Sequence, residues 1–238
     1  LDGLAITPSL FVVGVLGIVV LFGQVETVNG WDFASMLALL AVYLLLTALR
    51  NLFISPSLDA LAGMDGEVWS GRLDFTILRP IDTQFLASTR NWRLFSLTDL
   101  ALALGVLAVA LAQNSAAVTP ARLAAFALAL AAGMAVLYAV LLAFAGLVFW
   151  SPGFLFTWLF DGIFQMARYP VGIYPGWLRM VLTWVVPVGL MTTVPAQALS
   201  GDLTPGVLAG SIAAAALLVV AASVLFHVGL RRYASASS

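Results

Sequence analysis

Residues 123–149 read LAAFALALAAGMAVLYAVLLAFAGLVF, a run of 27 residues without a charge. A bilayer core of about 30 Å is crossed by a helix of about 20 apolar residues. The run is therefore long enough to span a membrane as one helix. Across all 238 residues, 63% are hydrophobic and 9% are charged, against about 25% charged residues in a typical soluble domain. This composition predicts an all-α integral membrane protein that crosses the bilayer several times.

Four further segments have the length and apolar character of spanning helices, and two others are interrupted. Asp161 interrupts the first of these two, and Pro187 and Pro195 interrupt the second. If both crossed the bilayer, the chain would cross seven times; one crossing plus a re-entrant return would give six. The four predicted spans are 4–22, 34–49, 94–112 and 207–229, and the interrupted segments are 154–167 and 180–198.

The placement of the ten arginines decides between these two topologies. Five lie in or beside the loop 54–93, so the positive-inside rule places this loop in the cytoplasm. Six crossings put seven arginines inside and three outside, whereas seven crossings would split them evenly. We therefore predict a single transmembrane domain, residues 1–238, with six crossings, both termini in the cytoplasm and an outer re-entrant segment over 168–198. The inner arginines would be Arg50, Arg72, Arg79, Arg90, Arg93, Arg231 and Arg232, and the outer ones Arg122, Arg168 and Arg179.

The composition also excludes several classes of function. The net charge of -1 leaves no basic surface for nucleic acid. The chain has no cysteine and one histidine, which excludes disulfide frameworks, thiolate catalysis and zinc clusters. No catalytic constellation is found in the sequence, so we do not expect an enzyme, and we expect no metal or cofactor in this chain.

The cytoplasmic loop contains the stretch EVWSGRLDFTILRP, residues 67–80. Gly71 can break a preceding turn, Asp74 can cap a short helix and Pro80 should end it. Leu73 and Ile77, four residues apart, would then form an apolar knob flanked by arginines. Such a knob could dock a soluble partner, or the stretch could be an ordinary solvated loop. The candidate docking residues are Gly71, Arg72, Leu73, Asp74, Ile77, Leu78, Arg79 and Pro80.

Two further groups of residues are candidates. Asp161, with Gln165 one turn later, could line a polar path, because an ionisable group at membrane depth is costly to bury. Alternatively, Asp161 lies near the membrane surface or pairs with Arg168. In the outer segment, tyrosine and tryptophan suit the headgroup region, and the prolines and glycines preclude one long helix. The residues singled out there are Arg168, Tyr169, Pro170, Tyr174, Pro175, Gly176 and Trp177.

Two of these stretches resemble a known family. Residues 71–80 are similar to the Gly-x-Leu-Asp-x-x-Leu-Leu-Arg-Pro signature in the cytoplasmic loop of bacterial type-two ABC transporter permeases, with Ile77 where Leu is more common. Residues 168–179, followed by Pro187 and by 195–199, resemble the outer segment of that family. The resemblance extends over nearly the whole chain. The family's basic amphipathic helix ahead of the first span is missing, so we expect the sequence to lack the start of the chain.

The resemblance implies a permease subunit with six spanning helices in the bacterial cytoplasmic membrane. Two permeases would form the pathway, the second a homologous rather than an identical subunit, with two ATPase subunits docked below. ATP and Mg²⁺ would bind to the ATPases, and residues 71–80 would receive their movement. Because the chain has no lysine, it has no phosphate-binding Gly-x-x-x-x-Gly-Lys-Ser/Thr motif. The family acts mainly in export.

Three functions therefore follow from the sequence. The first is an ABC exporter permease for an apolar or amphipathic cargo, since few charges lie at membrane depth. The second is an ion-coupled transporter or channel without an ATPase, using Asp161 and the broken segment 180–198. The third is a membrane scaffold without transport. Copurification of an ATPase would separate the first from the others.

Overall fold

The computed structural model describes residues 3–63, 65–113, 119–153 and 156–233, with side chains from Val12 onward except at 156–157. Helices make up nearly all of the described regular structure, and no strand occurs in these ranges. The prediction of an all-α protein is therefore confirmed. Residues 1–2 and 234–238 of the predicted domain, and 154–155 of the interrupted segment, lie outside the described ranges. The elements are α1 (Gly3–Phe22), α2 (Phe33–Leu49), η1 (Arg50–Ile54), α3 (Ser55–Leu58), η2 (Asp59–Leu61), α4 (Asp74–Ile77), α5 (Thr83–Thr89), η3 (Leu94–Ser96), α6 (Leu97–Gln113), α7 (Pro120–Leu147), α8 (Phe156–Phe164), η5 (Gln165–Arg168), η6 (Val171–Ile173), α9 (Gly176–Met180), η7 (Val181–Val185), η8 (Gly189–Thr193), α10 (Val194–Ser200) and α11 (Pro205–Arg232).

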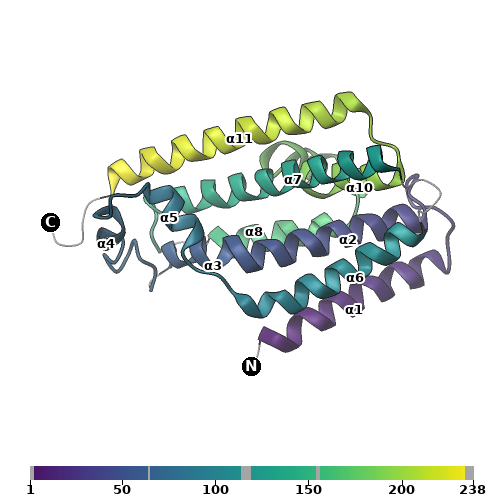
Figure 1. Ribbon diagram of the computed structural model, residues 1–238, viewed down its shortest axis with the longest axis horizontal. Coiled ribbons are helices and arrows are strands. Elements are labelled where there is room, and N and C mark those ends of the chain that lie inside the picture. The colour runs from purple at the N-terminus through teal and green to yellow at the C-terminus, as the bar shows by residue number, and fades with distance from the viewer. Residues whose placement is uncertain (1–2, 64, 114–118, 154–155, 234–238) are drawn as a thin grey trace.

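The long helices lie side by side as a bundle (Figure 1). Among the described residues, four helical stretches are long and apolar enough to cross a membrane, and a fifth if the bent pair 176–200 counts as one span. The helix α1 has 20 residues, of which Val12–Phe22 carry described side chains. The multi-pass character is thus shown, and the count of six crossings stays a prediction. The four stretches are Phe33–Leu61, Leu94–Gln113, Pro120–Leu147 and Pro205–Arg232.

Polar caps set where the long helices begin. The side chains of Asp32, Thr119 and Thr204 accept hydrogen bonds from backbone N–H groups in the first turns of α2, α7 and α11. Proline follows at the first position of α7 and α11, where its missing N–H would have no partner in any case. Each cap gives a partner to one of the N–H groups that the first turn of a helix leaves without an intrahelical acceptor.

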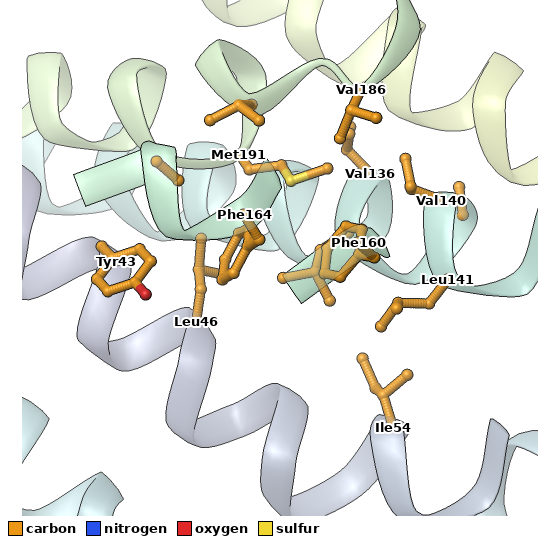
Figure 2. Packing of buried hydrophobic residues seen from close by; sticks show 14 of the residues in the cluster. Tyr43, Leu46, Ile54, Val136, Val140, Leu141, Phe160, Phe164, Val186 and Met191 are labelled. Atoms are coloured by element: carbon orange, nitrogen blue, oxygen red, sulfur yellow. The ribbon is translucent and has the colours of Figure 1, made fainter. Parts of the chain in front are cut away.

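The short helix α8 contributes two aromatic rings to the core. Phe160 and Phe164 are fully buried and stack with ring centroids 5.3 Å apart. Figure 2 shows both rings between Tyr43 and Leu46 of α2 and the valines of α7. Tyr43 meets the ring of Phe164 at 5.4 Å. The aromatic side of α8 is therefore packed in the core, whereas Trp158 and Asp161 on the same helix are partly or largely exposed.

Glycines on α7 allow close backbone contacts. A Cβ atom at Gly133 would lie 2.5 Å from the carbonyl oxygen of Met191, so only glycine lets η8 approach α7 this closely. A Cβ atom at Gly146 would lie 3.2 Å from the Cα atom of Phe226 on α11. Contacts of this kind replace the hydrophobic driving force that is missing between helices in lipid.

The segment between α8 and α11 is broken as the sequence predicts. The stretches Gly176–Val185 and Gly189–Ser200 meet at an angle of 73°, which is the geometry of a broken span or a re-entrant loop. Pro187 lies at the bend and cannot donate a backbone hydrogen bond. Gly201, in a left-handed conformation with φ of 91°, ends α10 beside Arg122 at the start of α7. Gly189–Ser200 packs into the bundle, whereas most of Gly176–Val185 is exposed and only Leu182 in it is buried.

Candidate functional site

The loop after η2 folds into a compact cap at one end of the bundle, where α4 and α5 lie beside the C-terminal end of α11 (Figure 1). Gly71 has φ of 72° and turns the chain just before α4. The carboxylate of Glu67 and the guanidinium group of Arg90 form an ion pair of 2.6 Å, and both side chains are mostly buried. Arg90 also donates to the Thr76 hydroxyl at 3.3 Å. These contacts hold α4 against α5.

The structure corrects two predictions about α4. Leu73 does not form an exposed knob with Ile77, because Leu73 is fully buried in the main core cluster while Ile77 is exposed. A helix of four residues has too little surface to stabilise itself, and burying Leu73 attaches it to the bundle. Asp74 is not the cap either: Leu73 occupies the cap position and Asp74 lies in the first turn.

The exposed face of the loop is made by other apolar residues. Phe75 is 73% exposed and Leu78 is 81% exposed. Residues two positions apart on a helix lie about 200° apart around its axis, so burial of Leu73 turns Phe75 outward. The side chains of Arg72 and Arg79 are exposed beside them. We call Arg72, Phe75, Leu78 and Arg79 the docking face. Sequence reasoning missed Phe75, because the spacing of Leu73 and Ile77 suggests that they mark the outer side.

Polar side chains link α5 to two long helices. The Gln84 amide nitrogen donates to the Tyr138 hydroxyl of α7 at 3.1 Å and to the Ser223 hydroxyl of α11 at 3.0 Å. The hydroxyls of Ser88 and Tyr138 are 2.9 Å apart. We call Gln84, Ser88, Tyr138 and Ser223 the polar junction. Sequence reasoning did not find it, because the side chains that bond to each other are separated by 50 to 139 positions.

A histidine and an acidic residue add a second link to α11. Asp82 caps α5 by accepting a 2.8 Å hydrogen bond from the Phe85 N–H, and this bond holds the pKa of the Asp82 carboxyl below its usual value. The other carboxylate oxygen lies 3.3 Å from Nε2 of His227. Nδ1 of His227 lies 2.8 Å from the Ser223 carbonyl oxygen, which can only accept. Both ring nitrogens of His227 therefore face oxygen acceptors, one on α11 itself and one on the cap of α5.

The end of α11 also meets α4. Tyr233 follows the last residue of α11, and burial together with the nearby Asp74 carboxylate raises the pKa of Tyr233 to about 12. The phenol is therefore neutral at physiological pH. Tyr233 also contacts the ring of Phe149 edge-on, with centroids 6.2 Å apart. The cap is thus attached to α11 at three places along one end of that helix: Ser223, His227 and Tyr233.

Asp161 forms an ion pair with Arg50, and the suggested pair with Arg168 is wrong. Seven helical residues put Arg168 about 10 Å further along the axis than Asp161, whereas Arg50 follows directly on α2, against which α8 packs. Arg50 is buried, donates to Ser55 Oγ at 2.8 Å and lies 5.1 Å from the centroid of the Phe160 ring. The Asp161 side chain is 43% exposed, and Gln165 is exposed one turn later.

The residues predicted in the outer segment are placed differently from one another. Arg168 lies over the Tyr43 ring at 5.5 Å, and the Tyr174 hydroxyl donates to the Met166 carbonyl at 2.8 Å. Pro170 is buried, Pro175 precedes α9, and Gly176 begins it. Tyr169 and Trp177 are exposed, as the prediction of a headgroup location requires. Within the described ranges, no three potential metal-ligating side chains come together.

Comparison with models of known protein families identifies the family of this chain. The family model described as "ABC-2 family transporter protein" matches residues 9–237. The chain belongs to the ABC-2 transporter family. It is therefore a multi-pass membrane component of an ABC transporter, of a family whose permeases are typically non-catalytic and work with ABC ATPase subunits. No curated protein and no solved structure matches the chain at a significant level.

Proposed function

We propose that this ABC-2 protein is the permease subunit of an ATP-driven exporter in the bacterial inner membrane. Its six crossings would place both termini in the cytoplasm, and a second, homologous permease would complete the pathway. Two ATPase subunits would bind ATP and Mg²⁺ and dock at 71–80, so this chain would need no cofactor of its own. The observation that carries the proposal is the docking face, in which Phe75 and Leu78 are exposed between Arg72 and Arg79 at the end of the bundle.

The docking face suits a protein partner better than water or lipid. Exposed aromatic and leucine side chains bind by filling pockets on a partner, and arginine recognises carboxylates in two-point contacts. Behind this face, Leu73 is buried and the Glu67–Arg90 pair connects the loop to α5. A push on α4 would therefore move α5 rather than bend the loop.

The polar junction would pass this movement into the membrane. Gln84 holds α7 and α11 through one amide group, and His227 and Tyr233 hold the loop to α11 at further points. These two helices pack closely against each other through Gly146. Movement of α5 would shift α7 and α11 together relative to α2 and α8. That shift would open or close a path for the cargo.

The cargo path would run along α8. Asp161 and Gln165 are exposed at adjacent turns of a segment whose other side is packed in the core. The remaining surface there is apolar, with Trp158 exposed, which favours an apolar or amphipathic cargo. The ion-coupled alternative needs an Asp161 carboxylate that is available to a transported ion, and the ion pair with Arg50 already occupies this carboxylate.

Copurification tests the proposal. The tagged chain is isolated in mild detergent from its own host, and copurifying ATPase is quantified. Replacing Phe75 and Leu78 with Asp should reduce the bound ATPase at least about tenfold, as expected for loss of central contact residues. The matched control is Phe75→Leu with Leu78→Met, which keeps the surface apolar. Leu73→Asp is not suitable, because it would put a carboxylate in the core.

Equal amounts of ATPase with the Asp and the conservative variants would refute the docking face. Absence of any ATPase from an intact, monodisperse preparation would favour the ion-coupled transporter instead, and transport driven by a proton gradient would then be measured with Asp161→Asn.

A further inference from the structure

A pocket of about 390 Å³ lies at the inner end of the bundle, beside the polar junction. Its walls come from η1, α5, the residues just after α5, and α7. Its volume is within the range of small-molecule sites, about 300–1,000 Å³. Neither the docking face nor the proposed path along α8 uses this pocket.

Aromatic rings dominate the wall. Phe53, Phe85, Trp92 and Tyr138 all line the pocket. Phe53 and Trp92 meet edge to face, with ring centroids 5.2 Å apart. Phe85 and Trp92 are both more than half exposed, so their rings are accessible from the opening. Ring faces carry partial negative charge and attract cations.

One charged group completes the wall. Of the nine residues that the structure describes around the pocket, Asp82 is the only acidic one and none is basic. The hydrogen bond from the Phe85 N–H and the 3.3 Å contact with His227 occupy only part of the Asp82 carboxylate, which has about four acceptor positions and a half-exposed side chain. An anion would be repelled here, and a cation would meet both a carboxylate and aromatic rings.

The other polar side chains of the wall already make hydrogen bonds within the protein. Gln84, Ser88 and Tyr138 bond within the polar junction, and the Thr89 hydroxyl donates to the Phe85 carbonyl at 2.8 Å. The pocket therefore offers little to a sugar or a polar neutral ligand, which needs several free partners.

We propose that this pocket binds an organic cation with an apolar body, with Asp82 as its counter-ion and Phe53, Phe85 and Trp92 around its charge. A role of this site in loading cargo rests on the proposed transport function, whereas the binding of the cation does not. Its place at the end of the bundle puts such a ligand at the level of the inner leaflet in the proposed topology.

The test uses the full chain purified in dodecyl maltoside with any bound partner, and equilibrium dialysis against tetraphenylphosphonium. Tetraphenylborate, which has the same shape and the opposite charge, is the control ligand. We expect saturable binding of the cation and at least tenfold weaker binding of the anion. Equal binding of the two ions would overturn the proposal.

Asp82→Asn is the first variant, because asparagine is as good a helix cap as aspartate and only the charge is lost. It should weaken binding at least about fivefold. Asp202→Asn, the same change of charge in the turn after α10, is the matched control and should leave the affinity unchanged. Trp92→Leu should weaken binding about two- to fivefold without touching the cap. If Asp82→Asn and Trp92→Leu both bind like Asp202→Asn, the proposal is wrong.

A lipid amine headgroup and a free amphiphilic cation share this chemistry. Short-chain phosphatidylethanolamine that displaces the bound cation, where phosphatidylglycerol does not, would identify the headgroup as the natural ligand; no displacement by either would identify a free cation. Charge-selective, Asp82-dependent binding without an ATPase partner would support the site while removing the exporter proposal. An ATPase partner without charge-selective binding would do the reverse.

Discussion

Replacement of Arg90 with Gln should loosen the cap that carries the docking face. The Arg90–Glu67 contact is 2.6 Å long, and the side chains are 21% and 15% exposed. Breaking a fully buried pair costs about 3–5 kcal/mol, and an exposed pair contributes about 0.2–1 kcal/mol. Nε and Nη2 of Arg90 are buried without hydrogen-bond partners among the described residues, so the substitution also removes two unfavourable groups. We therefore expect a net loss of about 2 kcal/mol, roughly a 30-fold change in the opening equilibrium.

Hydrogen exchange of the backbone amides in α4 and α5 measures this equilibrium directly. Protection of these amides should fall about 30-fold in Arg90→Gln, while protection in α7 should stay unchanged. Arg79→Gln removes the same charge from an exposed position of the same loop and should have no effect. Adding Glu67→Gln to Arg90→Gln should recover part of the loss, because no carboxylate is then left unpaired. If protection in α4 and α5 changes by less than about threefold, or if protection in α7 changes equally, the Glu67–Arg90 pair does not hold the cap closed.

Three further predictions concern the rest of the molecule. Protection of the α5 amides against hydrogen exchange should stay constant above about pH 3.9, the ordinary pKa of an aspartate. It should fall as the pH drops through the lowered pKa of Asp82 in the folded protein, and Asp82→Asn should abolish this pH dependence. Gly133→Ala, whose new Cβ atom would lie 2.5 Å from a carbonyl oxygen, should cost about 1–3 kcal/mol and lower the Tm by several degrees, whereas Gly210→Ala, with nothing within 4 Å, should not. If the Arg50–Asp161 contact holds α8 in place, Arg50→Gln should lower the yield of folded protein. The double variant Arg50→Asp with Asp161→Arg, which reverses the pair, should give a higher yield than Arg50→Gln.

Much of the bundle follows from local sequence. The charge-free run 123–149 predicts α7, although the helix begins three residues earlier because Thr119 caps it and Pro120 fits its first position. A helix predicted from hydropathy alone leaves out Arg122, although Arg122 lies in the first turn of α7. The interruption by Pro187 likewise predicts the bend between η7 and η8, because proline removes a backbone donor. These features depend on neighbouring residues, so a single sequence is enough to find them.

The candidate site depends on contacts that local pattern does not contain. Arg50 and Asp161 are 111 positions apart, and nothing in either flanking sequence indicates that α8 lies against the end of α2. The prediction that Leu73 lies on the outer side is wrong because spacing fixes which residues share a face, but not which face the bundle covers. The sequence therefore predicts which loop carries the candidate docking face, but it does not predict which side chains of the loop are exposed on that face.

The polar junction and the cation pocket share Gln84, Ser88 and Tyr138, so the two proposed activities cannot be independent. A ligand that contacts these groups would bind with one affinity before α5 moves and with another affinity after it has moved. By thermodynamic linkage, the factor by which ATPase binding changes the affinity for the ligand equals the factor by which the ligand changes the affinity for the ATPase. Binding of a ligand in the pocket would thus change the affinity of the docking face for the ATPase, through Gln84 and the Glu67–Arg90 pair. Gln84→Leu, which cannot hold Tyr138 and Ser223 together, should leave ATPase binding in place and remove the effect of the ATPase on the affinity of the pocket for the cation.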